Sequence, residues 1–543
     1  MQGMMMHRDL RIIDILTFAA EAYGDQGIVS ACEDGSRHRI SYPQVLGRVA
    51  QLSHALVAMG VQPGDRIGTL AWNSFRHFEL YYGISAIGAV CHTINPRLPH
   101  EQLIYMLHHA EDRVLFVDPS LVSLVEDMGD DLPAGIRLIV LCDAKDMPES
   151  SLDLGCYEDL IAPQPVQYDW PRWPEDTAAG LCYTSGTTGP PKGALYSHRS
   201  IVIHAMMVPL GFTNSFHAGH KVLPVVPLFH VNAWGLPYVA PLTGMTMVMP
   251  GRHLDGESLY QLMDAEQVWS AWGVPTVWAG VLATIRDKGT PPNGLGDLVV
   301  GGAAAAASMI AAYEELGIYV NHVWGMTEMS PVGTRGVLPS QMADAPLAAQ
   351  VEEKSGAGRR LFGVEFKIVD DAGVVLPHDG ASTGELFVRG NSVIRGYFNN
   401  AEASAAVMDA DGWFGTGDVA TIGPDGRLVI RDRAKDLVKS GGEWISSIDL
   451  ENAALSHSGI KTCAVVAVPH PKWDERPILV AVAASDDHPT LEDIHAHLAS
   501  DFASWQLPDD LILVEELPMT ATGKVSKLKL RQQLAGYILP EMR

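Results

Sequence analysis

The sequence of 543 residues is short of basic side chains. Its 38 lysine and arginine residues are outnumbered by 64 aspartate and glutamate residues, which gives a formal net charge of −26. A surface with this charge repels nucleic acid and anionic lipid, so we expect neither as a main partner. An anionic substrate would therefore need a local basic site. Charged residues are 19% and hydrophobic residues 47% of the chain, which is typical of a folded globular protein.

Cysteine pairs and long apolar runs are also missing. The six cysteines are scattered, with no Cys-x-x-Cys pair and no histidine spacing typical of zinc. They indicate thiols in a reducing compartment. Residues 1–10 lack the apolar stretch of a signal peptide. The longest small and apolar run, 298–313, is rich in alanine and glycine and ends at two glutamates, so it predicts no membrane span. We expect a cytoplasmic protein.

The chain is too long for a single hydrophobic core and should divide into at least two domains. Apolar residues recur at helical spacing from Val45 to Met59, after a start signal at Ser41 and Pro43. Short strand-like runs at 66–71 and 113–118 flank a further helical segment. This alternation predicts a layered α/β architecture.

The most informative stretch is the run 183–193, Tyr-Thr-Ser-Gly-Thr-Thr-Gly-Pro-Pro-Lys-Gly, between two strand-like segments. Glycine lets backbone N–H groups approach an oxyanion, hydroxyls donate further hydrogen bonds, and Lys192 adds a positive charge. We interpret it as an anion-binding loop suited to a triphosphate. A plain hairpin turn is the alternative, but such turns usually have about 2–5 residues. A Walker-type loop would need Ser or Thr after the lysine and a helix, whereas Gly193 and a strand follow.

This run resembles the signature of the adenylate-forming superfamily, which contains acyl-CoA synthetases, luciferases and peptide-synthetase adenylation domains. Further matching segments follow in family order along nearly the whole chain. The resemblance implies an α/β fold with a large N-terminal domain (1–432), a hinge (433–436) and a small mobile α+β C-terminal domain (437–543). The ATP-binding residues that it implies in the loop are Thr184, Ser185, Gly186, Thr187, Thr188, Gly189 and Lys192.

The segment 321–328, Asn-His-Val-Trp-Gly-Met-Thr-Glu, is the second match. The resemblance places Trp324 against adenine, Thr327 on phosphate and Glu328 on Mg²⁺, with Thr187 as a second metal contact. A hard oxygen ligand beside a polyphosphate is what Mg²⁺ prefers. The alternative is a capped helix start at Thr327. Relatives often carry Ser or Pro near residues 302–304, where this chain has glycine and alanine. The remaining nucleotide contacts implied by the resemblance are Gly302, Ala303, Ala304, His322, Val323, Gly325 and Met326.

Three later motifs complete the resemblance. In 413–418, Asp418 is expected to accept hydrogen bonds from both ribose hydroxyls, and Arg433 to reach the same ribose. Lys435 matches the family's hinge residue, and Lys524, near the C-terminal end, matches its adenylation lysine. Without that context, each would be read as a surface loop or turn. The glycine-rich residues implied to line the coenzyme A path are Lys439, Ser440, Gly441, Gly442 and Glu443.

The acyl pocket is implied by four residues. His230 and Trp234 lie in the apolar run 227–235, and Gly302 and Gly325 complete the pocket. A lone histidine in such a run is as often a buried core residue. Amino-acid-activating relatives usually place Asp at the His230 position, so an amino-acid substrate is disfavoured. Acetate-specific members carry Trp at the Gly325 position, so glycine predicts room for a longer acid.

These parts predict an AMP-forming acid–thiol ligase. ATP converts a carboxylate into an acyl-adenylate and releases pyrophosphate, and coenzyme A then opens the adenylate. The resemblance assigns catalysis to Lys524, Thr327, Glu328 and His230. The expected substrate is a small to medium apolar acid, namely a medium-chain fatty acid or 3-methylthiopropionate. An aryl acid remains an alternative.

Two other functions are alternatives for the same motifs. An adenylation enzyme that loads a carrier protein is one, and a non-catalytic nucleotide sensor on the same fold is the other. The sensor is disfavoured because Lys524 and Glu328 are both present. Relatives often form dimers, so a homodimer is an expectation from resemblance alone.

Overall fold

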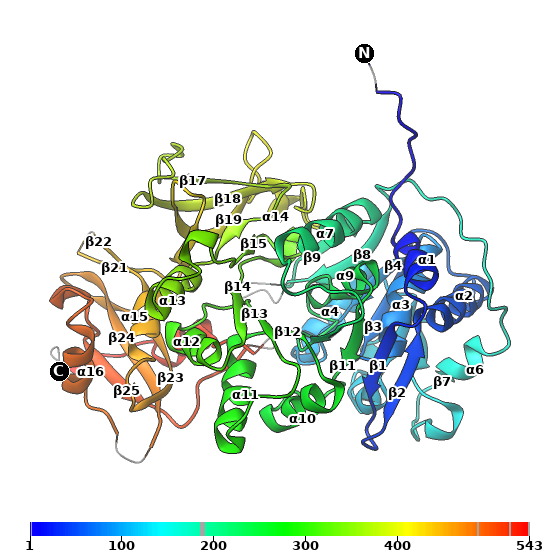
Figure 1. Ribbon diagram of the computed structural model, residues 1–543, viewed down its shortest axis with the longest axis horizontal. Helices are drawn as coiled ribbons and strands as arrows, with labels where there is room; N and C mark the ends of the chain where they lie inside the picture. Colours follow the sequence, from blue (N-terminus) through cyan, green and yellow to red (C-terminus); the bar gives the residue numbers. More distant parts are fainter. Residues whose placement is uncertain (2, 185–189, 442, 486–487, 521–522, 541–543) are drawn as a thin grey trace.

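Two large sheets built on the same plan form the body of the protein in the computed structural model (Figure 1). The structure describes residues 1, 3–184, 190–441, 443–485, 488–520 and 523–540. Each sheet has seven strands, which run parallel except for one antiparallel edge strand. The layered α/β architecture expected from the sequence is confirmed.

The first sheet, here called sheet A, consists in spatial order of β14 (Tyr319–His322), β13 (Asp297–Val300), β12 (Ser270–Gly273), β10 (Lys221–Pro224), β11 (Thr246–Met249), β1 (Gly27–Ala31) and β2 (Arg37–Ser41). The second, sheet B, consists of β7 (Leu154–Cys156), β6 (Arg137–Val140), β5 (Val114–Val117), β3 (Arg66–Leu70), β4 (Val90–Thr93), β8 (Ala178–Tyr183) and β9 (Gly193–Ser197). The strands expected at 66–71 and 113–118 are therefore confirmed to within a residue at each end.

Helices cover both faces of each sheet. Those that share the central core are α1 (Ile12–Ala22), α2 (Tyr42–Ala58), α3 (Phe75–Ala86), α7 (His198–Gly211) and α9 (Leu236–Thr243). The outer face of sheet A carries α10 (Gly256–Glu266), α11 (Pro275–Lys288) and α12 (Ala307–Glu315), and that of sheet B carries α4 (His100–Ala110) and α5 (Val122–Glu126). The other helices of the body are α6 (Tyr157–Ile161), α8 (Val231–Trp234), α13 (Leu347–Ser355) and α14 (Ala401–Ala405).

The start of α2 follows from its sequence. The side chain of Gln44 accepts a hydrogen bond from the Ser41 backbone N–H, and Pro43 occupies the first turn, where no N–H is needed. The helix ends at Ala58, one residue before Met59, the last apolar residue of the expected helical run.

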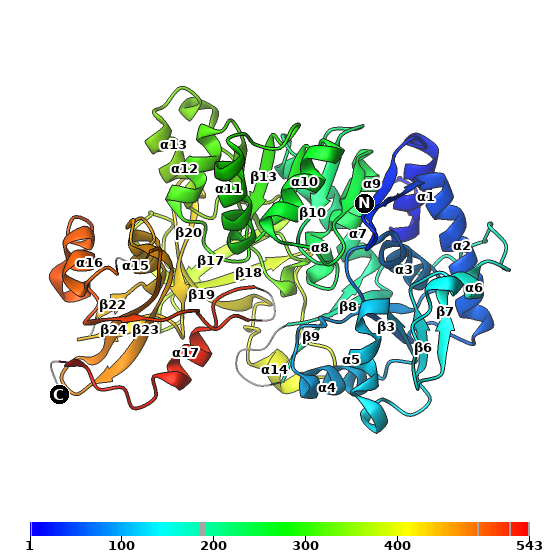
Figure 2. The same ribbon diagram turned by 90° about the horizontal axis from the view of Figure 1, so that it is seen from below.

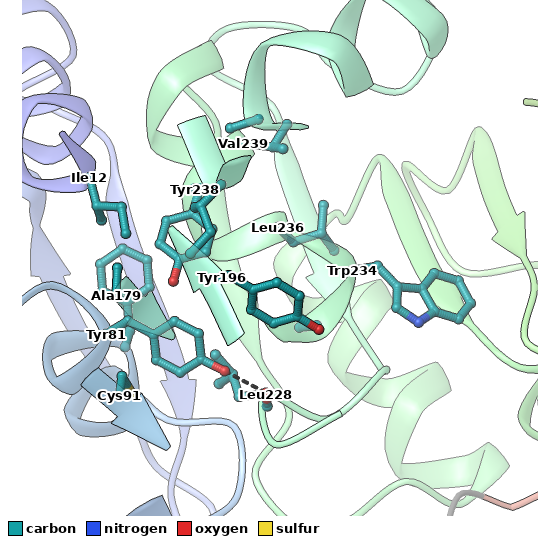
Figure 3. Packing of buried hydrophobic residues seen from close by; sticks show 14 of the residues in the cluster. Ile12, Tyr81, Cys91, Ala179, Tyr196, Leu228, Trp234, Leu236, Tyr238 and Val239 are labelled. Atoms are coloured by element: carbon teal, nitrogen blue, oxygen red, sulfur yellow. Dashed lines mark hydrogen bonds between the residues drawn. The ribbon is translucent and has the colours of Figure 1, made fainter. Parts of the chain in front are cut away.

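The core between the two sheets is rich in tyrosine (Figure 3). The rings of Tyr81, Tyr196 and Tyr238 lie close together there, and each is almost fully buried. The Tyr81 hydroxyl donates to the carbonyl of Leu228, so that its polar end is satisfied. This hydrogen bond ties the segment around Leu228 to α3.

Three smaller sheets follow. A two-stranded pair, β15 (Thr334–Arg335) and β16 (Arg359–Arg360), precedes an antiparallel sheet of β17 (Val364–Val369), β18 (Thr383–Gly390), β19 (Phe414–Ile422) and β20 (Leu428–Arg433). The C-terminal sheet has β22 (Glu443–Ile445), β21 (Val438–Ser440), β24 (Asp474–Ala483), β23 (Ile460–His470) and β25 (Asp510–Leu513), with α15 (Ser447–Ala454), α16 (Leu491–Leu498) and α17 (Lys527–Gln533) around it.

The C-terminal part has cores of its own and lies at one end of the molecule, as both views show (Figures 1 and 2). The small C-terminal α+β domain expected from the sequence is thus confirmed. The segment between β20 and β21 joins it to the body. The domain boundaries at 432 and 437 and the hinge at Lys435 stay predictions.

Candidate active site

The anion-binding loop joins two strands that pair with each other. Tyr183 of β8 is paired with Gly193 of β9, and the Thr184 N–H donates to the Lys192 carbonyl over 2.9 Å. The loop is therefore a hairpin connection by topology, but one much longer than an ordinary turn. Ser185, Gly186, Thr187, Thr188 and Gly189 lie outside the described residues. The structure fixes the two ends of the loop, including the base of Lys192.

Glu328 lies in a 3₁₀ turn, η4 (Thr327–Met329), that follows β14. Glu328 is 5% exposed, and the Tyr397 hydroxyl donates to its Oε1 over 2.6 Å. Burial raises the pKa of Glu328, which the hydrogen bond from Tyr397 and the charges of Arg433 and Lys192 oppose. The helix cap considered for Thr327 is absent, because Met326 precedes the turn and makes no capping bond. The Thr327 carbonyl accepts a hydrogen bond from Tyr196 instead.

The single carboxylate of Glu328 suits a magnesium ion whose other ligands are water and substrate phosphates. Among the described residues, no three His, Cys, Asp or Glu side chains gather at one point. Mg²⁺ is usually held by one or two carboxylates together with water and substrate phosphates. One buried carboxylate close enough to Lys192 for that charge to lower its pKa fits this pattern.

Trp324, Asp418 and Arg433 form a connected group. The indole Nε1 of Trp324 donates to Asp418 Oδ2 over 2.8 Å, and Arg433 Nε lies 2.6 Å from Asp418 Oδ1. Asp418 and Arg433 face each other across β19 and β20, which explains the short ion pair. A carboxylate has about four acceptor positions, so Asp418 can still accept hydroxyl groups. The structure therefore brings together three residues that are separated by long stretches of sequence.

The other expected nucleotide contacts follow β13 and β14. His322 is buried, and its Nε2 accepts a hydrogen bond from the Ala305 N–H, so its side chain supports the neighbouring turn. The Val323 N–H donates to the Val300 carbonyl. Ala303 and Ala304 are exposed. Met326 donates its N–H to the carbonyl of Pro331.

Lys524 reaches into this site from the C-terminal part. A Cβ atom on Gly302 would lie 3.4 Å from Lys524 Cε and 3.7 Å from Nζ. The hydroxyl of Thr276 in α11 donates to the Gly523 carbonyl over 3.1 Å, which ties the lysine loop to the body. Burial and, to a smaller extent, the charge of Arg433 lower the pKa of Lys524 to about 8, an effect that the charge of Asp418 opposes. The amine is thus held close to the body and partly shielded from solvent.

His230 is near the same amine. Burial and, to a smaller extent, the charge of Lys524 lower the pKa of His230 to about 3. His230 is therefore a neutral imidazole, able to donate from one nitrogen and accept at the other. Its segment is held by Asn73, whose side chain bonds the backbone of Pro224, Val226 and Leu228.

The residues after His230 adopt a conformation that the sequence did not predict. Val231, Asn232, Ala233 and Trp234 have φ values of 46°, 54°, 45° and 55°, which is a left-handed turn. Left-handed conformations cost roughly 1–2 kcal/mol per residue for ordinary side chains. Gly235 continues the turn at φ 83°, and its missing Cβ leaves room for His204. Surrounding packing must hold this turn, because its sequence does not favour it.

Of the expected pocket residues, Trp234 is well placed. Its ring lies where a side chain on Gly301 would stand, 3.1 Å from the Cβ position. Gly325 has a second reason to be glycine, because a Cβ there would lie 2.1 Å from the Pro331 carbonyl oxygen. The bearing of Gly325 on acid length stays a prediction.

The segment expected to line the coenzyme A path is on the C-terminal sheet. Lys439 and Glu443 are exposed, Ser440 accepts a hydrogen bond from Arg476, and Gly442 lies outside the described residues. No hydrogen bond or ion pair within the described part of the chain joins this segment to Trp324, Glu328 or His230. Lys435, the expected hinge residue, is exposed between β20 and β21. The structure thus brings Lys524 close to residues expected to bind the nucleotide, but not the segment expected to line the coenzyme A path.

Sequence reasoning missed three side chains that support the site. Tyr397 is not among the expected site residues, although a tyrosine next to glycine between two motifs was a usable signal. Asn73 and Thr276 carried no such signal, because their partners are backbone groups more than 150 and more than 240 residues away, respectively.

Known protein families match most of the chain. Residues 17–398 match the family described as AMP-binding enzyme, and residues 449–524 match the AMP-binding enzyme C-terminal domain. A 3-methylmercaptopropionyl-CoA ligase of Ruegeria lacuscaerulensis is 46% identical over 98% of this chain and 99% of its own length. A medium-chain-fatty-acid–CoA ligase of Ectopseudomonas oleovorans is 44% identical over 99% of this chain and 98% of its own.

The fold also has close matches among solved structures. The anthranilate CoA ligase AuaEII in complex with anthranoyl-AMP superimposes with a TM-score of 0.87 at 24% identity, covering 99% of this chain and 100% of that chain. This likeness concerns the fold alone. No helix in the described part of the chain is long and apolar enough to cross a membrane. With both of its domains matched and relatives above 40% identity along its length, the chain belongs to the AMP-binding enzymes of the adenylate-forming superfamily.

Proposed function

We propose that the chain is an ATP-dependent acid–thiol ligase that makes an acyl-CoA through an acyl-adenylate and releases AMP and pyrophosphate. The observation that carries this proposal is the position of Lys524. Its amine, from the C-terminal part, lies beside Gly302 and within electrostatic reach of Asp418, Arg433 and His230. A cation placed there can face both the carboxylate substrate and the α-phosphate.

In the first half-reaction, a carboxylate oxygen attacks the α-phosphorus and the bond to pyrophosphate breaks. Both reactants are anions, so positioning and charge stabilisation supply most of the rate. Lys524 would neutralise the charge that builds up where they meet. Asp418 and Arg433 would hold the ribose, and Trp324 would lie against the adenine. No protein nucleophile is required.

The other end of the nucleotide would meet Lys192 and Glu328. Lys192 would bind phosphate oxygens together with the loop residues Thr187 and Thr188. A magnesium ion held by Glu328 and Thr187 would supply charge neutralisation to the departing pyrophosphate. Glu328 would act as the ion's protein carboxylate and not as a proton carrier.

In the second half-reaction, the thiol of coenzyme A attacks the adenylate carbonyl, a thioester bond forms and AMP leaves. The segment from Lys439 to Glu443 would line the thiol's path after the C-terminal domain turns about Lys435. The same turn would remove Lys524 from the site. Such a domain movement would let one site serve two reactions in sequence.

For the acid, we propose the class named by the relatives: 3-methylthiopropionate or a medium-chain fatty acid. Trp234 is almost fully buried and His230 is a neutral imidazole, so neither offers a charge to a substrate, which favours an uncharged chain. An aryl acid is the alternative. We also propose a cytoplasmic location, because all six cysteines are free thiols, as expected in a reducing compartment. A homodimer remains a proposal by resemblance.

The test is an AMP-release assay with ATP, Mg²⁺ and free coenzyme A across a panel of acids. The panel contains 3-methylthiopropionate, hexanoate, octanoate, benzoate, cinnamate and acetate. We expect the highest kcat/KM for one of the first three acids, and at least about 10-fold less for acetate, because each missing methylene costs roughly 1–3 kcal/mol. Release of AMP only with a carrier protein as acceptor would overturn the proposal. A preference for benzoate or cinnamate would correct the acid class.

A further inference from the structure

The loop between β18 and α14 touches both ends of the phosphate-binding region. The backbone N–H of Ile394 donates to the Glu328 carbonyl over 2.9 Å, and that of Phe398 donates to the Gly193 carbonyl over 2.8 Å. Gly193 directly follows Lys192. One short loop therefore links the exit of the anion-binding loop to the turn that carries Glu328.

Tyr397, in this loop, makes the same link with its side chain. Its hydroxyl donates to Glu328 Oε1 over 2.6 Å, and the Nζ of Lys192 lies 5.2 Å from the centre of its ring. The backbone N–H of Tyr397 is bonded to Ser404, and its ring packs edge-on against Phe414. Tyr397 thus stands between the buried Glu328 and Lys192, the lysine of the anion-binding loop.

This placement keeps two opposite charges apart. Within the described residues, Lys192 and Glu328 form no ion pair, although the charge of Lys192 lowers the pKa of Glu328. A direct pair would neutralise both groups before a ligand arrived. The ring of Tyr397 offers the ammonium a weaker cation–π contact, and its hydroxyl occupies one carboxylate oxygen and leaves the other available.

We propose that Tyr397 is a positioning residue that holds Glu328 ready for a divalent cation and Lys192 ready for phosphate oxygens. This inference rests on the proposed function, because it assumes that ATP with its cation binds here. Tyr397 itself need not touch the reacting atoms. It acts through the two groups that do.

The test measures ATP binding by calorimetry in the full chain without acid or coenzyme A, so that no turnover occurs. Titrations are made in EDTA and at increasing MgCl₂ concentration. We expect Tyr397→Phe to raise the Mg²⁺ concentration needed for half-maximal enhancement of ATP binding by about 10-fold, the effect of one hydrogen bond to a charged group. ATP affinity in EDTA should change less than about 2-fold, since the ring under Lys192 remains.

A double-mutant cycle separates positioning from general damage. Glu328→Gln should shift the Mg²⁺ dependence more than Tyr397→Phe, and the double variant should be no worse than Glu328→Gln alone. Tyr397→Leu also removes the ring, so it should weaken ATP binding in EDTA by several-fold. Because this variant reports on Lys192, it also tests the proposal should Tyr397→Phe fold poorly.

Tyr260→Phe is a matched control. Tyr260 also donates its hydroxyl, here to the Thr290 carbonyl over 3.1 Å, and Lys288 lies 5.1 Å above its ring. It lies on α10 at the outer face of sheet A, so the variant should leave nucleotide binding unchanged. If Glu328→Gln shifts the Mg²⁺ dependence but both Tyr397 variants behave like Tyr260→Phe, the inference is wrong and the proposed function stands. If the unmodified chain binds no ATP, both fail.

Discussion

The two ends of the C-terminal part have opposite relations to the site. Lys524 is half-buried next to Gly302 and tied to the body through Thr276 and Gly523. The hairpin of β21 and β22, with Lys439 and Gly441 at its exposed edge, makes no described hydrogen bond or ion pair to the nucleotide residues. Under the proposed function, the structure has the arrangement for adenylate formation. The difference indicates that the small domain uses two separate segments: the Lys524 loop for adenylate formation and the hairpin of β21 and β22 for thioester formation.

The largest expected effect comes from removing the amine. Lys524→Ala should lower acid-dependent ATP–pyrophosphate exchange by at least about 1,000-fold, because electrostatic stabilisation at the reacting atoms is lost. Thioester formation from supplied acyl-adenylate should stay within about 3-fold, since this step does not use the amine. Lys529→Ala, an exposed lysine on the same segment, is the control. Equal losses in both half-reactions would contradict the division of labour.

Gly441 should show the reverse pattern. Its φ is 62°, and a Cβ would lie 3.0 Å from the Trp473 ring, so Gly441→Ala should shift the hairpin. We expect thioester formation to fall about 10- to 100-fold, as small displacements of binding groups can cost about 100-fold, with pyrophosphate exchange unchanged. Gly536→Ala is a matched control, because Gly536 has φ 82° and open space at its Cβ position. A loss confined to pyrophosphate exchange would refute the assignment of this edge.

The pH dependence should also differ between the two half-reactions. Burial lowers the pKa of Lys524 to about 8, so the charged form prevails below that pH and is lost above it. The kcat/KM for adenylate formation should therefore fall about 10-fold per pH unit above 8. Lys524→Arg keeps its charge over this range, so its slower reaction should show no such fall. The measurement is kcat/KM for adenylate formation from pH 6.5 to 9.5 in both proteins. An identical fall in Lys524→Arg would show that a group other than Lys524 causes the pH dependence.

The smallest effect is expected at the hydrogen bond between Thr276 and Gly523, which joins the body to the C-terminal part. Thr276→Val removes the hydroxyl that binds the Gly523 carbonyl. A single exposed hydrogen bond contributes little, so adenylate formation should slow by only about 2- to 3-fold. Thioester formation should be equal or slightly faster, because the domain is freer to turn. A slower thioester step would show that Thr276 acts on something other than the position of Lys524.

Much of the fold could be read from local pattern. The helix 42–58 and the strands at 66–70 and 114–117 were expected because period, caps and turns are properties of neighbouring residues. The pairing of β8 with β9 around the anion-binding loop also follows from two apolar runs that flank it. The assembly of these elements into two matching sheets needed the coordinates.

For the site, the sequence supplied the parts but not their contacts. Asp418, Trp324 and Arg433 were each singled out, yet the hydrogen bond and ion pair that join them depend on the register of β19 and β20 and on β14. The roles of Asn73 and Tyr397 were missed, because a polar side chain reveals its partner only when distant segments pack together.

The sequence by itself determined the family and the order of its motifs, since runs such as 183–193 and 321–328 are local and specific. Only the tertiary structure decided that Lys524 reaches Gly302, that Tyr397 separates Lys192 from Glu328, and that residues 231–234 take a left-handed turn. The physical reason is that local signals depend on adjacent residues, whereas these three features are held by burial and hydrogen bonds between segments far apart in the chain.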